Sequence, residues 1–186
     1  FIMVLISAYG QKRYLEPVFS GVSKNTVIYG HNFHVLYVPV TGHTALQPLV
    51  ADVYQPDGDT ETARPLILYF HSGNFLPFPQ NQSVSGTRSD STSVEMSRRL
   101  AKMGYVVASC DYRLGWNPVA PEQADRVSTL INAAYRGVQD ARTAVRYFKA
   151  NAGTFGIDTS KIVLWGQGTG GYITLATSTL DSYTKV

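Results

Sequence analysis

Short apolar runs alternate along the chain with longer stretches in which apolar residues recur every three or four positions. Residues 65–70 form a continuous apolar run, which is typical of a strand covered on both faces, and residues 105–110 and 162–165 have the same character. Two earlier runs are rich in β-branched and aromatic residues. The pattern predicts five strands, near residues 33–38, 49–55, 65–71, 105–111 and 161–165.

Three amphipathic stretches predict helices. The first begins at a capping box, Thr92-x-x-Glu95, whose side chains satisfy free backbone amides, and it ends at Gly104. The second covers residues 127–150 with one apolar face, and the third covers residues 172–180. This alternation predicts a three-layer α/β fold, with a mostly parallel sheet and helices on both faces. The two leading strands are expected to form an antiparallel edge.

Composition narrows the function classes. The chain has 186 residues and is 44% hydrophobic, which is enough for the core of one domain. The 16 basic and 13 acidic residues give a net charge of only +3, and the basic residues are scattered, so no nucleic-acid partner is expected. The single cysteine, Cys110, excludes an internal disulfide and a cysteine-based zinc site, and we expect it to be a buried apolar residue.

The first ten residues differ in composition from the rest. The run Phe1–Ala8 is apolar, and the small residues Ala8 and Gly10 suit a signal peptidase, so residues 1–10 are interpreted as a signal-peptide remnant and residues 11–186 as a partial domain. The alternative is a buried N-terminal strand. The run is shorter than the roughly 20 residues of a membrane-spanning helix, and no later stretch is apolar enough for a span.

Two loops at the carboxyl ends of predicted strands carry the candidate chemistry. They are Phe70–Phe75 (FHSGNF) and Trp165–Gly171 (WGQGTGG). Together with Asp111-Tyr112-Arg113-Leu114, they resemble the α/β-hydrolase superfamily, specifically its carboxylesterase-like branch. The resemblance covers about residues 26–186 and implies the N-terminal portion of that fold.

The resemblance also implies an activity and a location. It points to hydrolysis of carboxylic esters, and it extends to secreted bacterial hydrolases, some of them exported by the type IX route. We therefore expect a secreted or cell-surface bacterial protein that meets a small ester or acyl ligand and export machinery. The exposed sheet edge of such a partial fold predicts that the missing C-terminal part of the same protein, or a partner chain, covers it. No cofactor and no metal ion are expected.

The chain departs from the family pattern where a hydrolase has its nucleophile. Gly168 stands at the position of the family's serine, and a glycine has no side chain to attack a carbonyl carbon. The triad acid and histidine follow the nucleophile in this family, yet no histidine follows Gly171, and Asp181 is in the wrong place for the acid. The domain is therefore expected to be catalytically inactive as it stands, a pseudoenzyme. The alternative is an active ester hydrolase in a truncated or serine-to-glycine form.

The oxyanion side of the family's site is retained. By resemblance, the backbone amides of Gly73, Asn74 and Thr169 would stabilise an oxyanion, and His71 would orient the loop. The side chain of Thr169 is not expected to replace the nucleophile, because such a turn directs only one side chain into the site.

Other interpretations of these residues remain open. Gly166-x-Gly168-x-x-Gly171 also fits the dinucleotide-binding fingerprint, so a Rossmann-like domain is a further alternative, although the acidic residue expected about 20 positions later is missing. Asp111 is expected to cap a turn. The remaining histidines are expected to be surface or edge residues rather than metal ligands: His31, His34 and His43.

Overall fold

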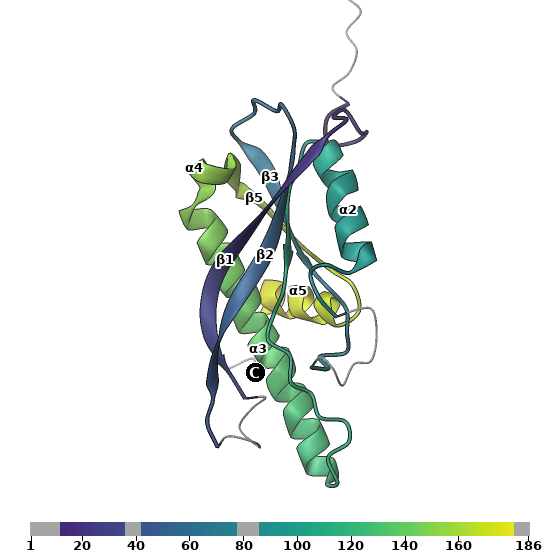
Figure 1. Cartoon of the computed structure of the whole chain (residues 1–186), viewed down its shortest axis with the longest axis vertical. Helices are drawn as coiled ribbons and strands as arrows, with labels where there is room; N and C mark the ends of the chain where they lie inside the picture. Colours follow the sequence, from purple (N-terminus) through teal and green to yellow (C-terminus); the bar gives the residue numbers. More distant parts are fainter. Residues whose placement is uncertain (1–11, 36–41, 78–85, 181–186) are drawn as a thin grey trace, which may run out of the picture.

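A five-stranded sheet forms the centre of the computed structural model, which describes residues 12–35, 42–77 and 86–180 (Figure 1). The strands are β1 (Val22–His34), β2 (Ala45–Pro56), β3 (Arg64–Phe70), β4 (Val106–Cys110) and β5 (Ile157–Gly166). Their order across the sheet is β1-β2-β4-β3-β5. β2 pairs antiparallel with β1 and β4, whereas β3 pairs in parallel with β4 and β5. The predicted antiparallel edge is confirmed.

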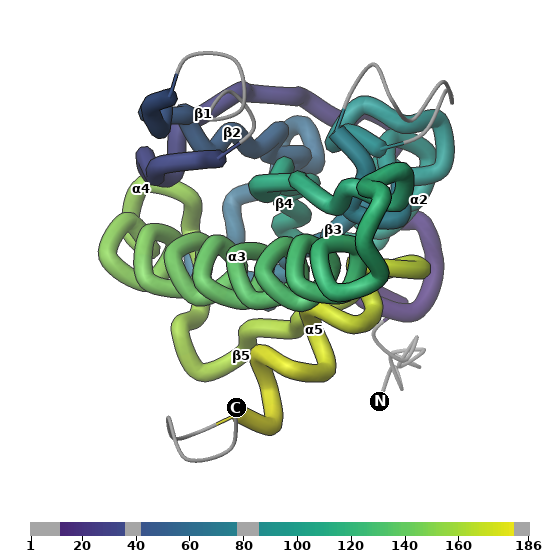
Figure 2. The backbone as a smooth tube through the Cα atoms, turned by 90° about the horizontal axis from the view of Figure 1, so that it is seen from below, coloured from purple at the N-terminus to yellow at the C-terminus, as the bar shows by residue number. Residues whose placement is uncertain are grey.

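Helices cover both faces of this sheet, which confirms the three-layer prediction. α2 (Ser91–Lys102) packs on one face against β2 and β4. α3 (Gln123–Ala150) and α5 (Thr169–Thr179) lie on the other face and contact each other, and α4 (Ala152–Phe155) is a single turn before β5. Figure 2 shows α3 crossing one side of the sheet while α2 lies on the opposite side.

Two apolar clusters hold the three layers together. The larger lies between the sheet and helices α3 and α5, and it contains Phe70, Phe148 and Ile173. The smaller lies between the sheet and α2 and contains Tyr69. β4 is buried along its whole length, which explains its continuous apolar sequence. Cys110 is buried in the larger cluster, as predicted.

The first strand was predicted at the wrong place. β1 runs from Val22 to His34 instead of over residues 33–38, and residues 36–38 lie outside the described chain. β1 is an edge strand whose first residues, such as Lys24 and Asn25, are exposed and polar. An edge strand of this kind lacks the apolar run by which a buried strand is recognised.

The boundaries of the helices also differ from those predicted. Asp90 is the residue directly before α2, and its carboxylate accepts the backbone amides of Gly86 and Thr87 rather than an amide of the helix, while Glu95 pairs with Arg99. The predicted capping box, Thr92 with Glu95, is therefore wrong. The predicted stop is confirmed, since Gly104 follows the helix with a φ of 104° that favours glycine. α3 and α5 both begin before their predicted first residues.

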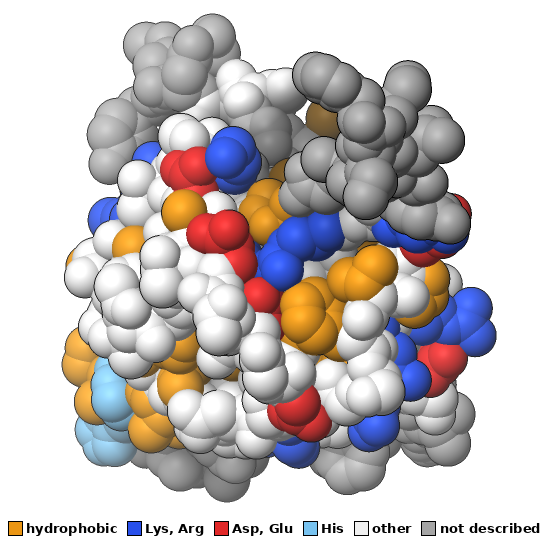
Figure 3. Space-filling view, turned by 90° about the horizontal axis from the view of Figure 1, so that it is seen from above, with side chains coloured by type: hydrophobic (Ala, Val, Ile, Leu, Met, Phe, Trp, Pro, Cys, Tyr) orange, Lys and Arg blue, Asp and Glu red, His pale blue; other side chains and the backbone are white. Residues whose placement is uncertain are grey.

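Two expectations concern the ends and the surface of the chain. The predicted signal-peptide remnant, residues 1–10, lies outside the described residues. Within the described ranges, no helix has the length and apolar character needed to cross a membrane. The face at the amino ends of the parallel strands carries acidic side chains beside basic ones (Figure 3), in keeping with the scattered charge of the sequence.

Candidate functional site

The parallel arrangement of β3, β4 and β5 brings three loops to one edge of the sheet. These loops begin at His71, Asp111 and Gln167. One hydroxyl joins them: Tyr112 donates a hydrogen bond to the His71 carbonyl oxygen at 2.9 Å, and its oxygen lies 3.1 Å from Oγ1 of Thr169. Tyr112 had no role in the predicted site, although its place directly after a buried strand was a signal for one.

The loop after β3 follows a backbone path that side chains rarely adopt. φ is 125° at Gly73 and 56° at both Asn74 and Phe75. Contacts of Phe75 hold this path: its carbonyl oxygen accepts the amide of Trp116 at 3.0 Å, and its buried ring meets the edge of Tyr112 at 6.0 Å between centroids. Backbone strain held in this way is typical of functional loops. It coincides here with the two loop amides that were predicted to bind an oxyanion.

The turn from β5 into α5 is equally sharp and has Gly168 at its tip. Gly168 has a φ of 56° and a ψ of −121°, a conformation that costs a side-chain-bearing residue about 1–3 kcal/mol. α5 begins at the next residue, Thr169. A Cβ built on Gly168 would lie 2.3 Å from Oγ of Ser72, so the loop after β3 fills the space beside this glycine. Ser72 was not among the predicted site residues, because the sequence gives no indication that it lies close to Gly168.

Two other glycines of this turn are required by close backbone packing. A Cβ on Gly166 would lie 2.2 Å from the backbone of Gly170. A Cβ on Gly170 would lie 2.0 Å from the Phe70 carbonyl oxygen. Glycine therefore allows β5, α5 and the end of β3 to approach each other. Gly171 has only an ordinary contact at 3.5 Å. Packing thus accounts for most of the glycine pattern without a bound nucleotide.

His71 is buried beneath the loop after β3, and its ring is held on several sides. The ring stacks on Tyr112 with centroids 4.4 Å apart, and Nδ1 lies 2.5 Å from the Ser72 carbonyl oxygen. Nε2 lies 3.8 Å from Oδ1 of Asp111. Burial lowers the pKa of His71, so the ring is neutral at neutral pH. These contacts suit the predicted orienting role, which stays a prediction.

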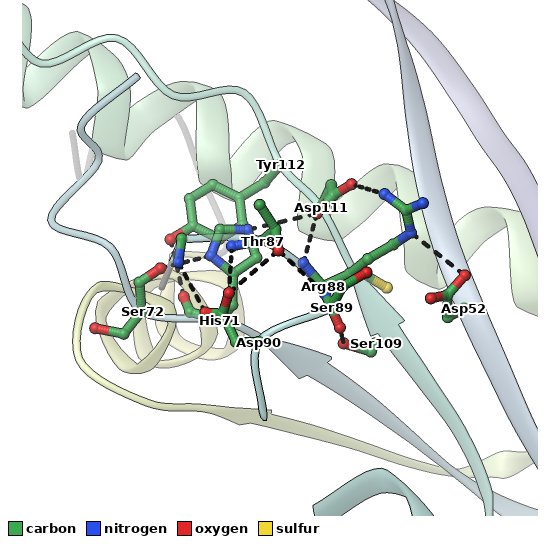
Figure 4. Close-up of polar contacts among 12 residues, drawn as sticks. Asp52, His71, Ser72, Thr87, Arg88, Ser89, Asp90, Ser109, Asp111 and Tyr112 are labelled. Carbon is green, nitrogen blue, oxygen red and sulfur yellow. Dashed lines mark hydrogen bonds and ion pairs between the residues drawn. The ribbon is translucent and has the colours of Figure 1, made fainter. Parts of the chain in front are cut away.

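Asp111 binds the segment before α2 rather than capping its own turn, so that expectation was wrong (Figure 4). Its carboxylate accepts the Arg88 backbone amide at 2.7 Å and pairs with the Arg88 guanidinium. The same guanidinium lies 3.3 Å from Asp52 of β2. Burial favours a raised pKa at Asp52, but the hydrogen bond from Thr26 and the charge of Arg88 lower it. One arginine is thus fixed by two carboxylates beside the site.

An apolar pocket of about 370 Å³ lies between the loop after β3, the N-terminal half of α3 and the start of α5. Its lining is mostly apolar and aromatic: Asn74, Phe75, Trp116, Leu130, Ile131, Ala134, Thr169 and Tyr172. Asn74 and Thr169 therefore place two of the predicted oxyanion amides next to an apolar space. A second, more polar hollow of about 240 Å³ lies beside His71 and Asp111.

The histidines of the leading strands form no metal site. Among the described residues, no group of three or more His, Cys, Asp or Glu side chains could hold a metal ion. His31 and His43 are exposed, as expected. His34 lies on the edge strand β1, which the expectation of a surface or edge residue allowed, but it is only 5% exposed and is not a surface residue. The two-residue period of β1 turns His34 inward, where burial and the charges of Arg113 and Arg136 lower its pKa.

Comparison with known proteins identifies the family. A sequence model of the BD-FAE family matches residues 51–186, well over half of the chain. The chain belongs to the BD-FAE family. This BD-FAE chain is similar to Gut esterase 1 of Caenorhabditis elegans, with 27% identity over 125 residues that cover 65% of the chain and 20% of that protein. It is also similar to Secreted lipase 5 of Gibberella zeae, with 30% identity over 117 residues, 62% of the chain and 20% of that protein.

Solved structures share the fold. A hyperthermophilic esterase from the archaeon Pyrobaculum calidifontis superposes with a TM-score of 0.51 and 28% identity, over 90% of this chain and 40% of that one. A bacterial heroin esterase superposes with a TM-score of 0.52 and 26% identity, over 86% of this chain and 39% of that one. The BD-FAE chain therefore has the N-terminal portion of an α/β-hydrolase fold of the carboxylesterase-like kind, as predicted.

The BD-FAE chain spans about a fifth of the length of these curated relatives and about two fifths of the solved esterases. The esterase relationship and the packing of the turn glycines do not favour the dinucleotide-binding alternative.

Proposed function

We propose that this BD-FAE domain binds the acyl or ester part of a small ligand at the carboxyl ends of β3 and β5, and that it has no nucleophile of its own to cleave it. The conformation of Gly168 carries the proposal. A strained turn from strand to helix is the place where an α/β-hydrolase presents its nucleophile. Gly168 has a φ of 56° and a ψ of −121° at such a turn and carries no side chain.

Two features support ligand binding at this place. Within residues 12–35, 42–77 and 86–180, no group accepts the backbone amides of Gly73, Asn74 or Thr169, and such amides are suited to a carbonyl oxygen. The adjoining apolar pocket, with Phe75 and Trp116 in its lining, is suited to the hydrocarbon part of an ester. A site that keeps these groups can bind an ester, but without a nucleophile it loses most of the rate enhancement of such a hydrolase.

Ester hydrolysis by the whole protein is the second candidate. The relatives are esterases and a lipase by name, which favours this activity. The described residues supply no nucleophile at Gly168, so a hydrolytic centre would need its reactive groups from other parts of the protein.

Two measurements on the full-length protein test the proposal. Ethyl benzoate is expected to quench the fluorescence of Trp116 saturably, and Trp116→Phe is expected to remove that component of the signal. Turnover of p-nitrophenyl acetate is expected to stay near the rate of the buffer. Robust turnover would overturn the non-catalytic part of the proposal, and the absence of saturable quenching would overturn the binding part.

We also propose that the protein acts outside the cell. Support comes from the signal-peptide-like composition of residues 1–10 and from similarity to a lipase named as secreted. N-terminal sequencing of the natural protein is expected to find a mature chain that begins near Gln11. A mature chain that still carries Phe1–Gly10 would contradict export by this route.

A further inference from the structure

The side chain of Ser72 occupies the space beside Gly168. A Cβ built on Gly168 lies 2.3 Å from Oγ of Ser72 and 3.2 Å from its Cβ. Another rotamer of Ser72 would relieve the first contact but not the second, which is shorter than the roughly 3.5–4.0 Å of a favourable carbon–carbon contact. A side chain at position 168 therefore requires the hydroxyl of Ser72 to turn away and the Cβ of Ser72 to move by a few tenths of an ångström.

The hydroxyl of Ser72 lies beside the position that a side chain of residue 168 would take at the turn from β5 into α5. Ser72 is half-buried, and Gly168 beside it is exposed. Figure 4 shows the side chain of Ser72 on the opposite side of His71 from the pair between Asp111 and Arg88. Ser72 directly precedes the two loop residues whose amides are proposed to bind a carbonyl oxygen. The hydroxyl and these amides thus belong to one short strained loop.

His71 is not a base for this hydroxyl. Its Nδ1 lies 2.5 Å from the Ser72 carbonyl oxygen, and a carbonyl oxygen only accepts, so Nδ1 carries the proton of the neutral ring. Nε2 faces Asp111 instead, at 3.8 Å. A serine hydroxyl without an adjacent base is a weak nucleophile, but it remains a good hydrogen-bond donor.

We propose that Ser72 is the ligand-contacting hydroxyl of this site, that it donates a hydrogen bond to the carbonyl oxygen of a bound carboxylic ester, and that Gly168 lacks a side chain to make room for it. The inference rests on the proposed binding function. It goes further by naming the residue that selects a hydrogen-bond-accepting ligand.

The steric half of the inference is tested by a double-mutant cycle on the full-length protein, in which the Tm of each variant is measured by thermal unfolding. Gly168→Ala is expected to lower the Tm of the domain by about 4–10 °C, because it adds a methyl group to filled space. In the background of Ser72→Gly, the same substitution is expected to lose about half as much, since only the backbone strain remains. Equal losses in both backgrounds would refute the steric conflict between the two positions.

The ligand half is tested by the quenching of Trp116 with ethyl benzoate. Ser72→Ala is expected to weaken binding about 2–10-fold, the usual worth of one hydrogen bond. Ser23→Ala, on the exposed part of β1, is the matched control and should bind like the wild type. Unchanged binding by Ser72→Ala would refute the contact. A wild-type protein that does not bind would refute both this contact and the proposed function, whereas the thermal cycle would still decide the steric half separately.

Discussion

Replacing Asp140 by asparagine is expected to destabilise the domain strongly, because Asp140 neutralises a buried arginine next to the site. Arg113 and Asp140 are only 4% and 0% exposed at their side chains. The carboxylate accepts the Arg113 backbone amide at 2.9 Å, its Nε at 2.9 and 3.0 Å, and its Nη2 at 2.8 Å. Breaking such a pair leaves a buried charge and costs about 3–5 kcal/mol. That is a large share of the roughly 5–15 kcal/mol that stabilises a domain.

Thermal unfolding of the full-length protein measures this loss. A cost of this size lowers the Tm of a domain of this length by about 6–20 °C. Asp158→Asn is the matched control, since it breaks an exposed pair with Lys161 at 2.7 Å and should leave Tm nearly unchanged. The double replacement Arg113→Met with Asp140→Leu should recover only part of the loss, because it removes both charges but leaves the Arg113 backbone amide and the Phe33 carbonyl oxygen without these partners. A Tm for Asp140→Asn equal to that of the control would refute the reasoning.

Three further predictions follow from the site. Tyr112→Phe removes the hydroxyl that joins His71 to Thr169 and should destabilise the domain by about 1–3 kcal/mol in denaturant titrations, because it leaves a buried carbonyl unpaired. The pKa of His71 is lowered from 6.5 in the folded state, so stability present above pH 6.5 is lost as the pH falls and the unfolded chain takes up a proton. The Tm of His71→Asn should therefore fall less than that of the wild type between pH 7 and 5. Gly168→Ser alone should give no turnover of p-nitrophenyl acetate above the wild type, because its Cβ meets Ser72, and strong turnover would contradict the steric argument.

The parts of the fold that could be predicted are the elements whose burial produces a recognisable apolar pattern in the sequence. β3 and β4 are covered on both faces, so nearly all of their consecutive residues are apolar, and this run is visible in the sequence. β1 is half exposed at the edge of the sheet, and because many of its residues are polar, its sequence lacks the apolar run that predicts a strand. The start of α2 was misplaced because Asp90 and Thr92 are both good capping residues, and only the position of the preceding loop decides between them.

The candidate site was predictable as a place but not as a set of contacts. Parallel strands put their carboxyl ends at one edge, so the loops at His71 and Gln167 had to be neighbours. The contact between Ser72 and Gly168, and the bonds of Tyr112, join residues that are far apart in the chain. These contacts form only because the folded backbone brings the residues within 4 Å of each other, which the sequence does not reveal.

The position of the Tyr112 hydroxyl has a consequence for the motion of the pocket. Tyr112 is bound on one side to the residue that begins the loop after β3, and on the other side to the first residue of α5. The two walls of the pocket therefore shift together rather than independently. A ligand that fits needs little further ordering of these walls on binding. A ligand that is too large must displace the loop and the helix at once, so the pocket is expected to discriminate between ligands by size more sharply than a pocket with separate walls.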